Sequence, residues 1–309
     1  MKVSIVIPVF NEYESLPILK EELVKNLMPY EKWEVIFIDD GSSDGSTDLL
    51  LDLCSENKNF KMIQFFRNYG KSAALSEGFK SANGDYIITM DADLQDDPTE
   101  IKNLIKKLDE GWDLVSGWKK TRLDPLNKKI PSKIFNWVTR LMTGVKIHDF
   151  NCGLKGYKKS VVKTIDLYGG RHRYIPAIAG QRKFRVTEII VNHRSRKYGK
   201  TKYGGSRIFH GFFDLITVLF LNRFTQQPLH LFGSFGIGFF ITGFIIEAFV
   251  LYYKYYLNHP FSKHMALLTF GVMLIVIGIQ FFSIGLLGEL LAKSTQGHEN
   301  RIKKNHNND

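Results

Sequence analysis

The sequence is poor in cysteine and lacks several common functional signatures. It has only two cysteines, Cys54 and Cys152, in 309 residues, which is too few for a disulfide framework, so we expect both to be reduced. The apolar run within Met1–Phe10 is very short, and we interpret it as a buried strand and not as a signal peptide. The absence of a GxGxxG motif after that strand argues against a dehydrogenase.

The charge of the chain is unbalanced toward the basic side. Lysine and arginine together number 42 against 31 aspartates and glutamates, which gives a net charge of +11. One basic cluster, Arg182–Arg207, directly precedes the apolar part of the chain, as expected beside a membrane with anionic headgroups. No zinc-finger spacing and no RNA-binding aromatic motif accompanies this cluster, so we expect no nucleic-acid partner.

Long hydrophobic runs are absent from the first two hundred residues, but two occur later. Leu231–Tyr253 contains one charged residue, Glu247, and Leu267–Leu287 contains none. At about 1.5 Å per residue, each can span a hydrocarbon core of roughly 30 Å. Because a short link, Lys254–Ala266, joins them, we predict a transmembrane hairpin. The alternative is a buried helical hairpin in a soluble protein.

The flanking charges predict how this hairpin is oriented. The tail after it carries the basic residues Lys293, Arg301, Lys303 and Lys304. Under the positive-inside rule, the tail and the large N-terminal domain are then cytoplasmic. We therefore expect a catalytic domain over 1–205, an amphipathic juxtamembrane segment over 206–228, a hairpin over 229–291 (spans at about 231–253 and 267–290) and a basic tail over 292–309. The helical spacing in Ser206–Asn222 fits a helix on the bilayer surface or one packed on a core.

Strand and helix patterns alternate along the first ninety residues. β-branched runs predict buried strands, and the segments between them have helical periodicity. The predicted strands are Val3–Val9, Glu34–Ile38, Lys61–Phe66 and Asp85–Met90, and the predicted helices are Glu14–Leu27, Ser46–Cys54 and Gly70–Ala82. This alternation predicts an α/β fold with a mostly parallel, Rossmann-like sheet covered on both faces. Ligands of such sheets bind at the carboxyl ends of the strands.

An acidic motif, Asp91–Asp93, follows the last of these strands. Two carboxylates two residues apart at a strand end can bind one divalent cation together with a ribose. The cation would neutralise charge that develops on a leaving nucleoside diphosphate. The motif continues acidic through Asp96 and Asp97, which favours a metal site over a solvated acidic turn.

A second acidic segment, Asp39–Ser46, ends the second predicted strand. Its carboxylates can accept hydrogen bonds from ribose hydroxyls or from a nucleobase N–H. Asp44 or Ser46 can instead cap the following helix. Both interpretations hold together if Asp40 is functional and Asp44 or Ser46 is structural.

Taken in order, these segments resemble a known family. The motifs are Ile7–Glu12, Asp39–Gly45, Arg67–Lys71 and Asp91–Gln95. Their order resembles that of GT-A-type, family 2 inverting glycosyltransferases. The similarity is greatest to the dolichol-phosphate mannose synthase group, and within it to bacterial polyprenyl-phosphate glucosyltransferases with two C-terminal transmembrane helices. It covers about residues 3 to 290.

The resemblance implies a function and its ligands. A sugar would pass with inversion from a UDP- or GDP-linked donor to polyprenyl phosphate, for modification of cell-envelope glycans. The enzyme would lie in the cytoplasmic membrane as a homo-oligomer, for which the family resemblance suggests a tetramer, and would use Mg²⁺ or Mn²⁺. The implied metal ligands are Asp91, Asp93 and Gln95, and the implied nucleotide-sugar ligands are Pro8, Asn11, Glu12, Asp40, Arg67, Lys71 and Asp91.

Two further segments resemble the acceptor side of the family. In Asp149–Tyr157, Asp149 matches a carboxylate proposed as base or acceptor-site residue, and with Asp93 it is our candidate catalytic residue. Because a phosphate monoester is already anionic, Asp149 can position groups without acting as a base. Cys152 and Lys155 depart from the family's usual small residue and arginine. The phosphate candidates are Arg196 and Lys202, then Arg194, Lys119 and Lys133, since basic groups suit phosphate oxygens. Lys119 and Lys133, which lie in a second basic stretch, could instead be solvated surface, and Asp149 could pair with a nearby lysine.

Two other functions compete with this interpretation. A processive polysaccharide synthase of the same fold would carry a QxxRW motif, which is absent, since Gln181–Phe184 does not match it. A non-catalytic scaffold or lipid-carrier binding protein could keep the fold, but the intact acidic motifs argue against that. The sequence does not identify the sugar, the nucleotide, the length of the carrier lipid or the oligomeric state. His148, His172 and His193 lack metal-ligand spacing, and we expect them to be structural.

Overall fold

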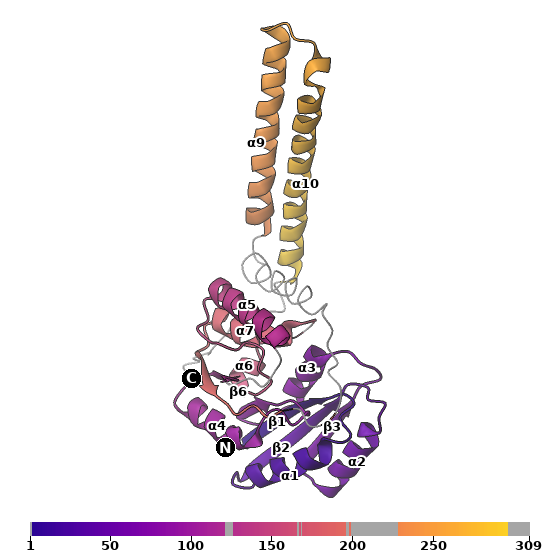
Figure 1. Ribbon diagram of the computed structural model, residues 1–309, viewed down its shortest axis with the longest axis vertical. Helices are drawn as coiled ribbons and strands as arrows, with labels where there is room; N and C mark the ends of the chain where they lie inside the picture. The colour runs from indigo at the N-terminus through magenta and orange to yellow at the C-terminus, as the bar shows by residue number, and fades with distance from the viewer. Residues whose placement is uncertain are drawn as a thin grey trace, which may run out of the picture. The chain divides into compact units, whose positions relative to one another are not determined.

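A computed structural model describes residues 2–120, 126–165, 167, 169–195, 198 and 228–295. The chain divides into two compact units, Met1–Leu219 and Phe220–Asp309. The first unit holds the sheet and its helices, and the second holds two long helices (Figure 1).

In the described part of the first unit, seven strands form the sheet, in the order β3-β2-β1-β4-β6-β5-β7. Six of these strands pair parallel wherever they are neighbours. They are β1 (Lys2–Val9), β2 (Lys32–Asp39), β3 (Phe60–Gln64), β4 (Tyr86–Thr89), β5 (Leu114–Trp118) and β7 (Val186–Ile190). The seventh, β6 (Lys155–Lys158), is antiparallel to β4 and β5. The predicted mostly parallel sheet is confirmed, and the predicted strands lie within a few residues of those observed.

Helices cover both faces of this sheet. They are α1 (Leu16–Leu27), α2 (Ser46–Glu56), α3 (Lys71–Ser81), α4 (Ile101–Asp109), α5 (Leu126–Thr143), α6 (Lys159–Val162) and α7 (Ile175–Gln181). Short 3₁₀ turns, η1 (Pro98–Glu100) and η2 (Arg171–Tyr174), precede α4 and α7.

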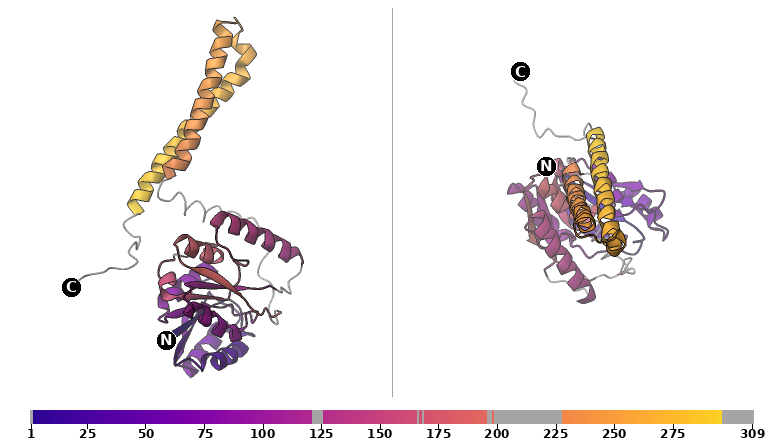
Figure 2. Two further views of the ribbon diagram at one scale, coloured as in Figure 1. Left: turned by 90° about the vertical axis from the view of Figure 1, so that its left-hand side faces the viewer. Right: turned by 90° about the horizontal axis from the view of Figure 1, so that it is seen from above.

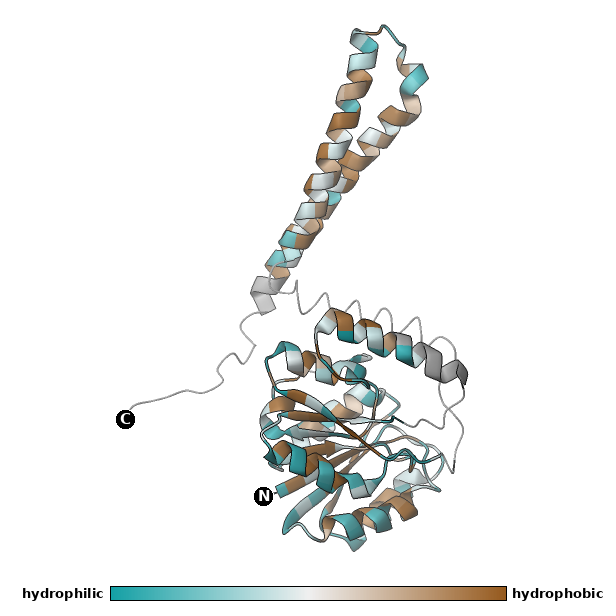
Figure 3. Cartoon of the chain, turned by 60° about the vertical axis from the view of Figure 1, so that its left-hand side comes forward, coloured by the Kyte–Doolittle hydropathy of each residue, from teal (hydrophilic) through white to brown (hydrophobic). Residues whose placement is uncertain are grey.

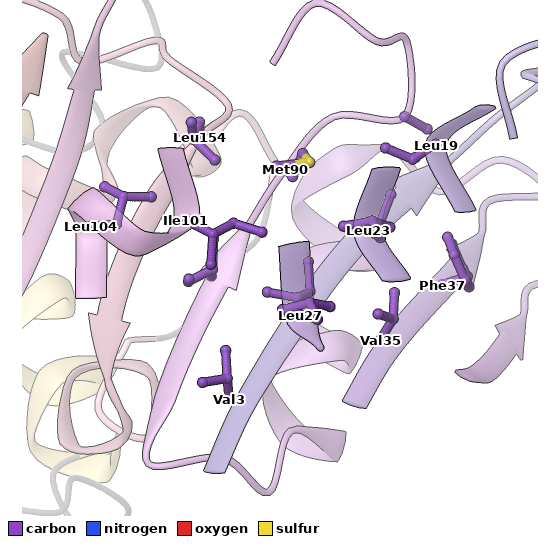
Figure 4. Close-up of a cluster of buried hydrophobic side chains, with 14 of the residues drawn as sticks. Val3, Leu19, Leu23, Leu27, Val35, Phe37, Met90, Ile101, Leu104 and Leu154 are labelled. Carbon is purple, nitrogen blue, oxygen red and sulfur yellow. The ribbon is translucent and has the colours of Figure 1, made fainter. Parts of the chain in front are cut away.

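Two apolar clusters hold these layers together. On one face, the buried leucines of α1, at three- and four-residue spacing, pack with residues of β1, β2, α2 and α4 (Figure 4). On the other face, buried residues of α3, α6 and α7 pack with β1, β2 and β4. Val6 and Ile36 face this second cluster, while their neighbours Ile5 and Val35 face the first. Continuous apolar strands buried on both faces are what a covered parallel sheet requires.

The second unit is a helical hairpin of α9 (Pro228–Tyr255) and α10 (Met265–Thr295), with a 3₁₀ turn, η3 (Phe261–His264), between them. Both helices are long and apolar enough to cross a membrane (Figure 3). Most of each helix is exposed. They lie side by side in both views of Figure 2. A Cβ on Gly236 would come within 2.7 Å of the Gly278 carbonyl oxygen, so small residues permit this close approach.

Some domain predictions fall outside the described residues. The predicted juxtamembrane helix over 206–228 and the basic tail over 292–309 lie there, apart from Pro228 at the start of α9 and the helical backbone of 292–295. Cys54 and Cys152 are both free thiols.

Candidate active site

Asp39 ends β2 and shapes the loop after it. Its carboxylate is buried and accepts hydrogen bonds from the Ser42 N–H at 3.0 Å and the Thr47 hydroxyl at 2.6 Å. These bonds fold residues 40–47 back over the strand end. Asp39 is therefore part of the scaffold of the site.

Asp40 holds a neighbouring loop in place. Its carboxylate accepts the Tyr69 N–H at 2.7 Å and the Gly70 N–H at 2.9 Å. Burial raises the pKa of Asp40, although these two N–H groups act in the opposite direction. Beside it, Gly41 has a φ of +73°, and a Cβ there would lie 2.6 Å from the Arg67 carbonyl carbon. Asp40 and Gly41 thus fasten the Arg67–Lys71 motif to the end of β2.

The loop after β1 is fastened to the same place. The Asn11 N–H donates to the Ser42 hydroxyl at 3.0 Å, and its side-chain oxygen accepts the Ser43 N–H at 2.8 Å. The Glu12 N–H donates to the Ser46 hydroxyl at 3.0 Å. Pro8 lies near the end of β1 in register with Ile38 of β2. The predicted nucleoside ligands Pro8, Asn11, Glu12 and Asp40 therefore gather at one edge of the sheet.

The N-cap residue of α2 is neither Asp44 nor Ser46. Gly45, with a φ of +89°, occupies that position and has no side chain to accept a hydrogen bond. Asp44 still has a structural role, because its carboxylate accepts from the Ser46 N–H at 3.0 Å and the Tyr13 N–H at 3.1 Å. It joins the loop after β1 to the start of α2.

The acidic motif after β4 alternates between exposed and buried side chains. Asp91, Asp93 and Gln95 are partly exposed, whereas Ala92 and Leu94 are buried. Leu94 has a φ of +61°, at the point where the chain turns. The Asp93 carboxylate accepts the Gln95 N–H at 3.2 Å. The three residues predicted to bind a metal are thus the accessible residues of this motif.

Asp91 pairs with a lysine from another predicted motif. Its Oδ1 forms an ion pair with Nζ of Lys71, the first residue of α3. Burial alone would raise the pKa of Asp91, but the ammonium groups of Lys71, Lys119 and Lys155, with Lys71 contributing most, together lower that pKa to about 2. Asp91 is therefore ionised at neutral pH.

The acidic extension of the motif is structural. Asp96 is buried, accepts the Asp91 N–H at 3.2 Å and forms an ion pair with Lys119 Nζ at 2.8 Å. Asp97 accepts the Thr99 N–H at 3.0 Å and lies 2.8 Å from the Arg194 guanidinium. These carboxylates hold the turn that carries Asp91, Asp93 and Gln95 in place.

Arg194 and Lys119, both predicted phosphate ligands, are held by carboxylates. The Arg194 guanidinium donates to both carboxylate oxygens of Glu22, at 2.7 and 2.8 Å, besides its contact with Asp97. This arrangement favours an anchoring role for Arg194. Lys119 is mostly buried, and its contact with Asp96 raises its pKa against the effect of burial.

The predicted acceptor segment packs directly against the acidic motif. A Cβ on Gly153 would lie 2.6 Å from Asp91 Oδ2 and 2.9 Å from Asp96 Oδ2, so no larger residue fits there without displacing a carboxylate. The Gly153 carbonyl accepts from the Thr89 hydroxyl at 2.8 Å. Residues 149–155, about sixty residues later in the chain, are thereby joined to the end of β4.

Asp149 and Lys155 support this segment from inside. The buried Asp149 carboxylate accepts the Asn151 N–H at 3.0 Å, and its carbonyl accepts the Ser116 hydroxyl at 3.1 Å. The buried Lys155 ammonium donates to the Cys152 carbonyl, and burial lowers the pKa of Lys155. Burial also raises the pKa of the Cys152 thiol to about 12, so this thiol is not a nucleophile at neutral pH.

A cavity of about 560 Å³ opens beside Asp149. It brings together three predicted acceptor-side residues, Asp149, Lys119 and Lys133. Its other lining residues were not predicted from the sequence and are Trp118, Lys120, Ser132, Asn136, Trp137, Arg140 and His148. Arg140 follows Lys133 by seven residues, two helical turns of α5, and this spacing is a signal from which the sequence could have identified it.

Several histidines and arginines lie around the acidic motif and around the cavity beside Asp149. His148 stacks on Trp118 with ring centres 4.2 Å apart, and its backbone N–H donates to the Glu188 carboxylate at 2.6 Å. His172 Nδ1 lies 2.9 Å from the Ser72 hydroxyl, and burial lowers the pKa of this imidazole. Arg67 is exposed, with its guanidinium 5.1 Å from the centre of the Tyr69 ring. Arg196 and Lys202 lie outside the described residues.

Comparison with solved structures identifies the fold. Glucosyl-3-phosphoglycerate synthase from Mycobacterium tuberculosis with phosphoglyceric acid superposes with a TM-score of 0.56 at 16% identity, over 72% of this chain and 79% of that one. The same enzyme with Mn²⁺, UDP and phosphoglyceric acid gives a TM-score of 0.55 at 14% identity, over 72% and 78%. The predicted GT-A fold is confirmed.

Comparison with curated sequences identifies relatives along almost the whole chain. A dodecaprenyl-phosphate galacturonate synthase of Rhizobium johnstonii is 36% identical over 95% of this chain and 88% of its own length. An undecaprenyl-phosphate 4-deoxy-4-formamido-L-arabinose transferase of Salmonella choleraesuis is 37% identical over 94% and 88%. The model of the family described as glycosyl transferase family 2 matches residues 4–166. The chain belongs to glycosyl transferase family 2.

Proposed function

We propose that this protein transfers a sugar from a nucleotide-sugar to polyprenyl phosphate. One observation carries the proposal: Gly153 packs against Asp91, which brings the acidic motif and the segment of Asp149 together. A transferase needs its donor and acceptor centres adjacent, because the two substrates react directly. The names of the Rhizobium and Salmonella relatives, both sugar transferases or synthases of polyprenyl phosphates, support this substrate class.

The donor centre is the edge of the sheet formed by the ends of β1, β2 and β4. Pro8, Asn11, Glu12 and Asp40 surround the position for the nucleoside. Arg67 and Lys71 are the cations beside it that could meet the diphosphate. Asp40 holds the loop that carries both, so its substitution should disturb the donor centre even without direct contact.

A divalent cation fits the accessible residues of the acidic motif. Asp91, Asp93 and Gln95 offer only oxygen ligands, which suits Mg²⁺ or Mn²⁺. Among the described residues, no three His, Cys, Asp or Glu side chains form a complete metal cluster, so oxygens of the diphosphate would be needed to complete the coordination. When bound, the cation would stabilise the charge of the leaving nucleoside diphosphate. The Mn²⁺ and UDP in the Mycobacterium tuberculosis structure support this assignment.

The cavity beside Asp149 is the proposed site of the acceptor phosphate. Lys119, Lys133 and Arg140 line it and provide positive charge, while Trp118 and Trp137 provide apolar surface. The phosphate is already anionic at neutral pH, so Asp149 is proposed to position the acceptor segment, with Asp93 acting at the donor. Arg196 and Lys202, which follow in the chain, remain proposed phosphate ligands. Direct attack by the phosphate would invert the anomeric configuration.

We further propose that the two apolar helices anchor the enzyme in the cytoplasmic membrane, with the catalytic unit and the C-terminal tail on the cytoplasmic side. The length and exposure of α9 and α10 support membrane insertion, and the basic tail supports the orientation. A reporter fused after Asp309 should then be cytoplasmic, and a tag near Asn258 external. The reverse labelling would contradict this topology.

The direct test of function is a transfer assay with the purified full-length protein in detergent. A panel of UDP- and GDP-sugars is incubated with polyprenyl phosphate and Mg²⁺ or Mn²⁺, and the lipid product is identified by mass spectrometry. We expect one sugar to be transferred, activity to be lost in EDTA, and NMR to show the inverted anomer. A non-catalytic scaffold would instead bind the lipid and form no product with any donor. The panel also identifies the sugar and the nucleotide.

A further inference from the structure

The ion pair between Lys71 and Asp91 joins two residues with different expected partners. Asp91 is a proposed metal ligand, and Lys71 is a proposed diphosphate ligand. In the structure they bind each other, and both remain partly accessible, with side chains 23% exposed for Lys71 and 34% for Asp91. A metal bound to Asp91 would therefore share its ligand with an ammonium group.

Both partners are held firmly by their surroundings. Lys71 begins α3 directly after Gly70, whose N–H, like that of Tyr69, is bound by Asp40. On the other side, Gly153 lies against Asp91 Oδ2, and the Asp91 N–H is bound by Asp96. The backbone positions are fixed, so the part of this contact that can move is the lysine side chain, with its flexible stem.

Among the residues that the structure describes, Lys119 and Lys155 also lie close to Asp91, and each has an acceptor of its own. Lys119 is paired with the buried Asp96 at 2.8 Å. Lys155 is buried and donates to the Cys152 carbonyl. Lys71 is thus the cation placed to neutralise Asp91 before substrate arrives and to leave it afterwards.

We propose that Lys71 competes with the divalent cation for Asp91, and that it transfers to the donor diphosphate when cation and nucleotide enter together. This inference rests on the proposed function. A dication at Asp91 would repel an ammonium a few ångströms away, and the diphosphate offers that ammonium a new anionic partner. Lys71 would then keep the empty site from holding metal tightly and would favour loading of metal with nucleotide.

This exchange predicts that Lys71→Met changes the affinities for Mn²⁺ and for UDP in opposite directions. In Lys71→Met the competing charge is removed, so Mn²⁺ alone should bind about tenfold more tightly, the effect expected of one charged contact in a partly exposed site. With Mn²⁺ saturating, UDP should bind about tenfold more weakly, because the diphosphate has lost a cation. A general loss of folding would weaken both.

The experiment measures binding and requires no turnover. Mn²⁺ binding to the full-length protein in detergent is followed by the EPR signal of free Mn²⁺, and UDP and GDP binding by calorimetry at saturating Mn²⁺. Lys80→Met is the matched control, since Lys80 lies on the same helix, is exposed and pairs with Glu77 at 2.6 Å. It should leave both affinities unchanged. Lys71→Arg, which keeps a competing cation, should return the Mn²⁺ affinity toward that of wild type.

The outcomes separate this inference from the proposed function. If wild type binds Mn²⁺, Asp93→Ala abolishes that binding, and Lys71→Met binds Mn²⁺ no more tightly than wild type, then the metal site stands and the competition is refuted. If wild type binds no Mn²⁺ with or without UDP, both the metal site and the competition are refuted. Equal tightening in Lys71→Met and Lys71→Arg would refute competition by charge.

Discussion

Two lysine–carboxylate clusters lie at opposite ends of the same sheet, and they are built differently. Near the amino ends of the strands, the Glu34 carboxylate accepts the Ser4 hydroxyl at 2.6 Å, the Asn83 N–H at 2.8 Å and Lys61 Nζ at 2.7 Å, and is only 3% exposed. At the carboxyl ends, Asp91 is 34% exposed and its ion pair is with a single flexible lysine.

The difference distinguishes a structural carboxylate from one that can exchange partners. Glu34 is saturated with protein donors, so another ligand would have to break several bonds at once. Asp91 keeps accessible surface and a mobile partner, so a cation can replace one contact with another. Substitutions in the first cluster should change stability, and substitutions in the second should change binding and turnover.

The largest effect is expected for Asp93→Ala in the accessible acidic motif. Loss of a metal ligand should reduce transfer by about a hundredfold to a thousandfold, since metal catalysis contributes several kcal/mol of transition-state stabilisation. The melting temperature should hardly change, because Asp93 is partly exposed. Initial transfer rates and thermal melts check this. Asp52→Ala, at an exposed position of α2, should keep full activity. An active Asp93→Ala variant would refute the metal site.

The second-largest effect is expected for substitution of Glu34, near the amino ends of the strands, and it concerns the stability of the protein. Burial would raise the pKa of Glu34, but hydrogen bonds from Lys61, Ser4 and Asn83 and the charge of Lys61 lower it to about 2. A lowered folded pKa stabilises the protein above the unfolded value, near 4.5, and this stabilisation is lost as pH falls toward 2. Glu34→Gln should therefore lower the free energy of unfolding at pH 7 by about 3 kcal/mol.

The pH dependence isolates this carboxylate from the others. The stability difference between wild type and Glu34→Gln, followed by thermal melts of the full-length protein, should shrink as pH falls from 4.5 toward 2. The affinity for UDP at pH 7 should be unchanged. A difference independent of pH would mean that shape, and not charge, determines the role of Glu34.

An intermediate effect is expected in the cavity beside Asp149. Arg140→Met should raise the KM for polyprenyl phosphate about tenfold, since a charged hydrogen bond contributes about 1.5 kcal/mol at the low end of its range. The KM for the donor should stay near that of wild type. Lys146→Met, an exposed cation of the same region that does not line the cavity, is the control. Equal effects of the two variants would indicate general attraction of the anionic lipid.

The smallest effect is expected at the margin of the Glu34 cluster. Lys2 Nζ lies 3.4 Å from Glu34, and its side chain is 34% exposed. Lys2→Met should change the free energy of unfolding by at most about 0.5 kcal/mol, because the ammonium of Lys2 stays in contact with water and lies beyond close hydrogen-bond distance of Glu34. Lys61→Met should cost more, about 1 kcal/mol, because its bond to Glu34 is shorter, at 2.7 Å. Denaturation curves of the two variants provide the measurement.

Local patterns were enough to predict the elements of the fold. Apolar strand runs such as Val3–Val9 and the charge-poor spans after Leu231 correspond to β1, α9 and α10. Their length and periodicity depend on neighbouring residues only, so the sequence by itself determined a covered, mostly parallel sheet and a helical hairpin. It also located Asp91, Asp93 and Gln95, because a motif directly after a strand lies at the strand's carboxyl end.

Long-range contacts were decided by the tertiary structure alone. The sequence did not indicate that Arg194 would bind Glu22, that Lys119 would bind Asp96, or that Lys71 would pair with Asp91. These partners lie between 20 and 172 residues apart. Which cation meets which carboxylate depends on how loops from different strands converge, and composition cannot specify that. The sequence therefore determined which charged groups this protein has at the ends of its strands, and the convergence of loops from different strands decided which of them meet.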